Sequence, residues 1–115
     1  MTYRVVFELT DSGKCQVEGE LTNIRHLLAE LGPQGIEVEL VAHSDGVVAL
    51  LRQNRAEAGP IEELAAHGVH FAACRNSLAS RGLTGADLLP TAAVVPSGIG
   101  EIVRRQAEGW LYVHP

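Results

Sequence analysis

Segments rich in β-branched and aromatic residues alternate along this chain with segments whose apolar residues recur every three or four positions. The first kind is typical of strands and the second of amphipathic helices. Strands that alternate with helices over short connections form βαβ units, whose strands lie parallel in one sheet. The predicted strands are residues 3–9, 36–42, 69–73, 92–95 and 110–113, and the predicted helical segments are residues 17–31, 47–51, 61–67, 75–81 and 99–108.

Glycine, proline and serine residues mark the limits of these segments. The dipeptide Gly59-Pro60 is expected to break the chain before residues 61–67. Ser97 is placed to cap the last helix, because its hydroxyl can accept a hydrogen bond from a free N–H group of the first turn. We predict one domain over residues 1–115, an α/β fold with three α/β/α layers around a five-stranded, mainly parallel sheet, in a flavodoxin-like architecture.

The charge balance excludes two classes of partner. Nine Lys and Arg residues against fourteen Asp and Glu residues give a net charge of -5, which repels a phosphate backbone and an anionic membrane. The longest stretch without a charged residue, 88–100, contains two prolines and is too short to span a bilayer. No secretory leader is recognisable at the start of the chain, so we expect a cytoplasmic protein that binds neither nucleic acid nor membrane.

Two cysteines, Cys15 and Cys74, lie far apart in the sequence and neither belongs to a CxxC pair. A disulfide framework or a cysteine zinc site is therefore not expected. A metal site could be built only from Cys15, His43, Cys74 and His114. These residues come from four separate segments and lack the local spacing typical of metal ligands. We predict no metal and no cofactor.

Ligands of open parallel sheets bind beyond the carboxyl ends of the strands, which makes the residue after each strand a candidate. Cys74 follows the third predicted strand and precedes a helical segment. Backbone N–H groups and the helix dipole at such a position lower the pKa of a thiol, and Arg75 or a protonated His43 would do the same. A thiolate placed there could attack a sulfane sulfur and carry a persulfide. The alternative is that Cys74 is a small buried apolar residue.

Other residues at the same edge could assist the thiol. His43 follows the second strand and could orient or protonate a substrate, although it could equally be a hydrogen-bonded loop residue. Ser97 and Gly98 follow the fourth strand, where glycine allows backbone N–H groups to approach a ligand closely. This turn lacks the Lys-Ser or Lys-Thr of a nucleotide-binding loop. Asn76 completes the candidate neighbours of the thiol.

Five motifs together resemble a known family: Gly68-Val69-His70-Phe71-Ala72-Ala73-Cys74, Arg81-Gly82-Leu83, Asp87-Leu88-Leu89-Pro90, Val41-Ala42-His43 and Val95-Pro96-Ser97-Gly98. In their order and spacing over nearly the whole chain they resemble short, stand-alone members of the DsrE family. The resemblance implies a DsrEFH-like sandwich that assembles into homotrimers or homohexamers. In the sulfur-relay branch, a cysteine ahead of a helix bearing Arg-Gly accepts and passes on a persulfide, and Cys74 occupies the matching position.

Two functions remain open at this point. In the first, the protein is a sulfur carrier or sulfurtransferase that works with a donor or acceptor protein: Cys74 is the nucleophile, and His43, Arg75, Asn76, Ser97 and Gly98 form its binding site. In the second, it is a non-catalytic homo-oligomeric module that binds a small ligand or a partner, with Cys74 only part of the pocket wall.

Overall fold

Five strands form one sheet in the order β4-β3-β2-β1-β5, and every neighbouring pair is parallel. The computed structural model describes residues 2–115. The strands are β1 (Tyr3–Leu9), β2 (Ile36–Ala42), β3 (His70–Cys74), β4 (Ala92–Val95) and β5 (Leu111–Val113). The helices are α1 (Lys14–Leu31), α2 (Ala58–Ala66), α3 (Arg75–Ala79) and α4 (Gly98–Ala107), with 3₁₀ segments at Gly32–Gln34, Ser44–Leu50 and Gly85–Asp87.

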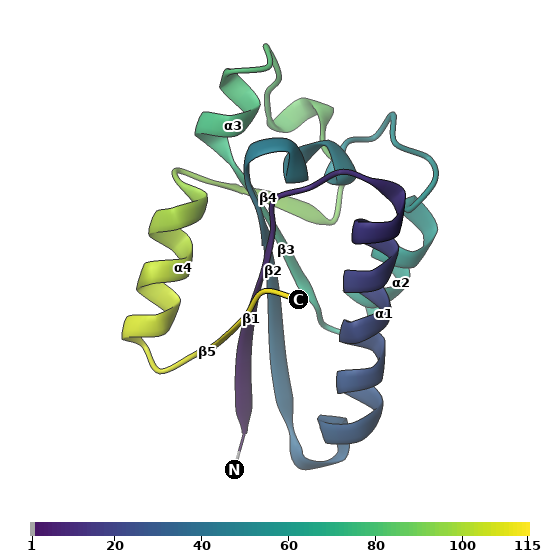
Figure 1. Cartoon of the computed structure of the whole chain (residues 1–115), viewed down its shortest axis with the longest axis vertical. Coiled ribbons are helices and arrows are strands. Elements are labelled where there is room, and N and C mark those ends of the chain that lie inside the picture. Colours follow the sequence, from purple (N-terminus) through teal and green to yellow (C-terminus); the bar gives the residue numbers. More distant parts are fainter. Residues whose placement is uncertain (1) are drawn as a thin grey trace.

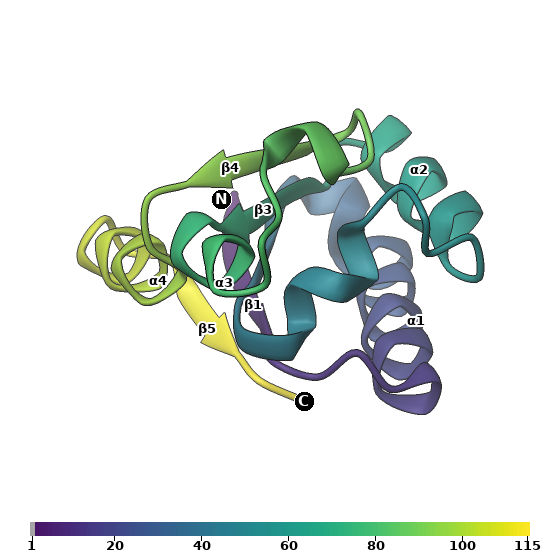
Figure 2. The same cartoon turned by 90° about the horizontal axis from the view of Figure 1, so that it is seen from above.

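The helices cover the two faces of the sheet unequally. Figure 1 shows α1 and α2 on one side of the strands and α4 on the other, and the view from above in Figure 2 agrees. The chain steps from β1 through β2 and β3 to β4 in one direction, and then returns across the sheet to β5. Because crossovers between parallel strands are right-handed, this reversal sends α4 to the opposite face from α1 and α2.

Side chains alternate along the strands between the two faces of the sheet, so the core consists of two apolar clusters, one on each face. In β1, Val5, Phe7 and Leu9 belong to the larger apolar cluster, which includes residues of α1 and α2. Val6 points to the other face and belongs to a smaller cluster with Ile102 of α4. The larger cluster supplies most of the stabilisation, since each fully buried aliphatic or aromatic side chain contributes about 1.5–3 kcal/mol.

Several predicted element boundaries are wrong, most clearly in the segment between β2 and β3. Helix α2 begins at Ala58, so Gly59 and Pro60 lie inside its first turn instead of breaking the chain. Proline is tolerated there because the first N–H groups of a helix have no partner within the helix. Residues 47–50 of the predicted helix 47–51 belong instead to the 3₁₀ segment Ser44–Leu50, and Leu51 follows it in an extended conformation. Within residues 2–115 no helix combines the length and the apolar character needed to cross a membrane.

The reversal of the chain also creates a topological switch point at the carboxyl edge of the sheet. The connection after β3 returns over the face of α1 and α2, because its Leu88 and Leu89 pack into the larger cluster. The connection after β4 leads into α4 on the other face. Loops that leave neighbouring strands toward opposite faces create a crevice at the carboxyl edge of the sheet, which is the usual ligand site of open α/β sheets. Cys74, at the end of β3, lies at this switch point.

Candidate functional site

Cys74 is both the last residue of β3 and the residue that immediately precedes α3. Its backbone is extended, with φ -68° and ψ 119°, which is the geometry of a residue that caps a helix. The residue is buried, with 6% of its surface exposed. The strand therefore anchors the thiol, while the free N–H groups of the first turn of α3 are directed toward it.

Polar groups surround the sulfur and change its acidity. Burial raises the pKa of the Cys74 thiol, whereas hydrogen bonding to the Ser77 hydroxyl lowers it. Backbone N–H groups of Gly98, Ser77 and Asn76 lower it further. These hydrogen bonds outweigh burial, so the pKa lies below the ordinary value for cysteine. A neighbourhood of this kind favours the thiolate, which is the nucleophilic form.

The N–H of Gly98 brings a second helix to the thiol, since Gly98 is the first residue of α4. Ser97 caps this helix, as predicted: its hydroxyl accepts a hydrogen bond of 3.1 Å from the N–H of Gly100. The cap satisfies the Gly100 N–H and leaves that of Gly98 directed at the sulfur. Cys74 consequently lies at the N-termini of two helices, where the partial positive charge of each dipole stabilises an anion.

Gly98 also packs closely against both His43 and Cys74. A Cβ atom added to Gly98 would lie 2.8 Å from the Cβ of His43 and 3.3 Å from the Cβ of Cys74. Both distances are shorter than ordinary contacts between carbon atoms. Any side chain at this position would push the two residues apart, so the close approach of His43 and Cys74 depends on glycine.

Ser77, which sequence reasoning missed, connects the thiol to the loop after β2. Its Oγ accepts a hydrogen bond of 2.8 Å from the N–H of Ser44. Because this bond uses the oxygen as an acceptor, the hydroxyl hydrogen stays free to donate to the Cys74 sulfur. Ser44 has φ 53°, the only positive φ of a non-glycine residue within residues 2–115. Such strain is stored at functional sites. The Cys-x-x-Ser spacing could have indicated Ser77, since it matches that of a helix cap and its N3 residue.

Replacing Ser77 with alanine is expected to raise the pKa of the Cys74 thiol, because the thiolate loses a hydroxyl donor. Iodoacetamide should then alkylate Cys74 about fivefold more slowly at neutral pH, as expected for loss of about 1 kcal/mol of hydrogen bonding. The measurement is made in a Cys15→Ser background, since Cys15 is exposed and would also react. Thr91→Ala, which removes an exposed hydroxyl just before β4, serves as the control and should leave the rate unchanged. An unchanged rate in Ser77→Ala would contradict the assignment.

Glu8 and Tyr112, also missed by sequence reasoning, meet His43 at the same edge. The buried carboxylate of Glu8 accepts hydrogen bonds from His43 Nε2 and from the Tyr112 hydroxyl. Burial raises the pKa of Glu8, but the hydrogen bonds from Tyr112 and His43 outweigh it, and the pKa is lowered. The same bond raises the pKa of Tyr112 to about 12. A lone glutamate in the apolar strand sequence of β1 was the available signal.

The remaining candidate residues have exposed side chains. Arg75 and Asn76 are exposed, and Asn76 reaches the thiol only through its backbone N–H. Arg75 lines an apolar cavity of about 390 Å³ between α3 and β4. Cys15 is exposed on α1, and His114 Nδ1 lies 3.6 Å from Glu8 Oε1. In the described part of the chain, no group of three or more His, Cys, Asp or Glu side chains is arranged to hold a metal ion.

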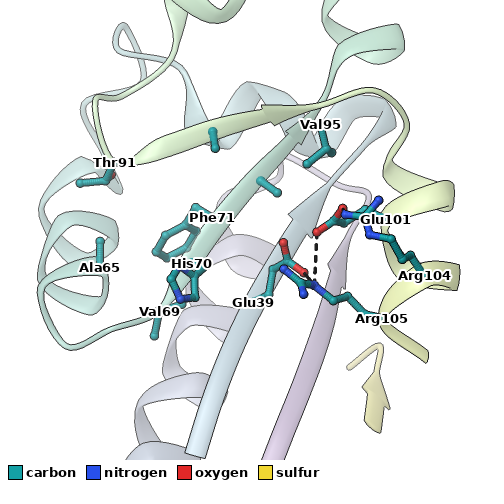
Figure 3. A pocket seen from close by; sticks show the side chains of 12 residues that line it. Glu39, Ala65, Val69, His70, Phe71, Thr91, Val95, Glu101, Arg104 and Arg105 are labelled. Carbon is teal, nitrogen blue, oxygen red and sulfur yellow. Dashed lines mark hydrogen bonds and ion pairs between the residues drawn. The ribbon is translucent and has the colours of Figure 1, made fainter. Parts of the chain in front are cut away.

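A separate hollow of about 460 Å³ lies on the α4 face of the sheet. Figure 3 shows Glu39 of β2 and Glu101 of α4 directed toward Arg105. Arg105 Nε lies 2.9 Å from Glu39 Oε1 and 3.4 Å from Glu101 Oε2. Burial, with a hydrogen bond to Glu101, raises the pKa of Glu39 to about 7. Cys74 does not line this hollow. The ion pairs of Arg105 with Glu39 and Glu101 join α4 to the sheet.

Comparison with known proteins places this geometry in context. The model of the DsrE/DsrF-like family matches residues 17–115. No curated protein matches the chain. Among solved structures, a protein of unknown function from Methanobacterium thermoautotrophicum, MTH1491, is 43% identical, with a TM-score of 0.94 over 98% of this chain and 99% of that one. The ychN protein of E. coli has the same fold, with 17% identity, a TM-score of 0.81 and full coverage of both chains.

Proposed function

The chain belongs to the DsrE/DsrF-like family, and from that premise we propose that it is a sulfur-relay protein whose Cys74 carries a persulfide. One observation carries the proposal: the thiol lies at the switch point of the sheet, with N–H groups from two helices lowering its pKa. A thiolate is the form that attacks sulfur, and donors directed at the sulfur also stabilise the more extended anion of a persulfide.

The transfer step needs no cofactor. The Cys74 thiolate attacks the outer sulfur of a donor persulfide, R–S–SH. The bond between the two donor sulfurs breaks as the new S–S bond forms on Cys74, and the donor leaves as the thiolate RS⁻. Passing the outer sulfur to an acceptor thiolate reverses these roles and restores Cys74. In this proposal His43 and the surrounding N–H groups stabilise the charged sulfur, and Ser97 with Gly98 shapes the pocket.

Assembly fits the same proposal. Members of this family are oligomeric, and we propose a homotrimer or homohexamer that exchanges sulfur with a donor or acceptor protein. Four large apolar side chains are exposed on α4 and β5: Ile99, Val103, Leu111 and Tyr112. Apolar surface of this kind is typical of an interface between subunits. A working free thiol also fits a cytoplasmic location, where cysteines stay reduced.

The direct test is to incubate the purified protein with a persulfide donor and to record its intact mass. We expect the mass to increase by one sulfur atom and the gain to be lost on reduction. The Cys74→Ser variant should show no gain. Cys15→Ser is the matched control, because it removes the other cysteine, which is exposed on α1, and it should load normally.

A second function is favoured by one observation, the 6% exposure of Cys74. If the thiol is never reached by a donor, the protein is a non-catalytic module and Cys74 is part of its pocket wall. Absence of any adduct on the parent protein, together with a Cys74 that does not react with thiol reagents, would reject the relay proposal. Loading of the Cys74→Ser variant to the level of the parent would reject it as well.

A further inference from the structure

A chain of hydrogen bonds leads from β1 toward the thiol, and it begins at Glu8. This carboxylate lies where β5 ends, so that the Tyr112 hydroxyl reaches it from one side and His43 from the other. His114 is 3.6 Å away, and Glu20 of α1 interacts with it electrostatically. Since the pKa of Glu8 is lowered, the group is ionised at neutral pH and can only accept hydrogen bonds.

An acceptor at this position decides which nitrogen of His43 bears a proton. Nε2 faces Glu8, so Nε2 must be the donor. In the neutral ring the basic nitrogen is then Nδ1, which lies 3.3 Å from the Ser44 hydroxyl. A carboxylate that fixes the tautomer and the orientation of a histidine in this way is a familiar device of metal and catalytic sites.

The next link is Ser44 itself. Its side chain contacts His43, and its N–H donates to Ser77 Oγ at 2.8 Å. With φ 53°, Ser44 holds a conformation that costs about 1–2 kcal/mol for a residue with a side chain, so contacts on both sides must maintain it. Ser77 hydrogen-bonds the Cys74 thiol, and its position therefore depends on how firmly His43 and Ser44 are held.

We propose that Glu8 is a positioning residue for Cys74: it holds His43 as a donor through Nε2, and through the contacts of His43, Ser44 and Ser77 it stabilises the thiolate. The proposal rests on Cys74 being a working thiol, but not on sulfur being its cargo. Tyr112 belongs to the same arrangement, because its hydroxyl fixes the second oxygen of Glu8.

A simple charge effect predicts the opposite result, which makes the proposal testable. If Glu8 acted only as a nearby negative charge, its removal would favour the thiolate and lower the pKa of Cys74. If Glu8 acts through His43, its removal disfavours the thiolate and raises that pKa. The direction of the change separates the two effects.

The experiment measures the pH dependence of Cys74 alkylation by iodoacetamide in the Cys15→Ser background. Glu8→Gln is expected to raise the pKa of Cys74 and to slow alkylation about threefold at neutral pH, a smaller loss than that of the direct donor Ser77. In a His43→Asn background, Glu8→Gln should have no further effect. Glu18→Gln, on the exposed side of α1, is the matched control and should react like the parent.

A pKa that stays constant or falls in Glu8→Gln would overturn the proposal, and so would a rise that persists in the His43→Asn background. If Glu8→Gln fails to fold, Tyr112→Phe decides in its place: a smaller rise that disappears with His43→Asn supports the proposal, and no rise overturns it. The measurement uses no sulfur donor. A protein that never loads a persulfide but shows this coupling would therefore retain the role of Glu8 and lose only the relay function.

Discussion

A Gly46→Ala variant is expected to lose about 3 kcal/mol of its free energy of unfolding, as in severe overpacking of a rigid site. An added Cβ would lie 2.1 Å from the carbonyl oxygen of Leu9, 2.7 Å from its carbonyl carbon and 3.2 Å from the N–H nitrogen of Thr10. All three are backbone atoms at the end of β1. That carbonyl oxygen also accepts the His43 N–H at 3.0 Å, so β1 cannot move without losing this bond.

Urea denaturation of the purified variant measures the loss. Gly59→Ala is the matched control, because an added Cβ there has no atom within 4 Å. Gly59 lies in the first turn of α2, so alanine should stabilise the protein slightly, by up to about 1 kcal/mol. A denaturation midpoint of Gly46→Ala equal to that of the parent would show that the loop after β2 adapts. The close approach of this loop would then not be what holds His43 at the site.

A Glu20→Gln variant is expected to be more stable than the parent at alkaline pH and equally stable at acidic pH. Glu20 lies on α1, is 5% exposed, and its Oε2 has no hydrogen-bond partner among residues 2–115. Burial, with repulsion from the Glu8 carboxylate as a smaller cause, raises its pKa from 4.5 to about 8. An acid with a raised pKa binds more protons in the folded than in the unfolded state, so stability falls as pH rises between these two values.

Glutamine removes this dependence, because it resembles the protonated acid in shape but does not titrate. The difference in free energy of unfolding between variant and parent should be near zero at pH 4, grow between pH 4.5 and about 8, and reach about 3–5 kcal/mol at pH 9. Glu39, whose pKa is raised to about 7, lowers the free energy of unfolding of variant and parent equally over part of this range, so it does not affect their difference. Glu18→Gln provides the control. A constant difference across the pH range would contradict the assignment to Glu20.

Much of the fold could be predicted from local patterns. The apolar spacing of α1 and the β-branched runs of β1 and β2 are encoded in neighbouring residues, because a helix buries every third or fourth side chain and a strand every second. Boundaries were less predictable. Pro60 indicates a break when it is considered alone, yet it is accommodated in the first turn of α2.

The residues of the candidate site were also only partly predictable from the sequence. Cys74 and the cap at Ser97 were predictable, since each follows a strand and precedes a helix, and parallel strands end at one edge of the sheet. Glu8 and Ser77 were not, because their roles depend on partners far away in the sequence. Glu8 lies 35 positions from His43 and 104 from Tyr112, and Ser77 lies 33 positions from Ser44.

The sequence by itself determined the alternation of strands and helices, and with it the placement of the Cys74 thiol at the carboxyl edge of a parallel sheet. Those properties follow from short-range spacing. Only the tertiary structure decided that the N-termini of two helices meet at the sulfur, and that Glu8 reaches His43. Both depend on the order of the strands and on the reversal that carries α4 to the opposite face, which come from packing between distant segments.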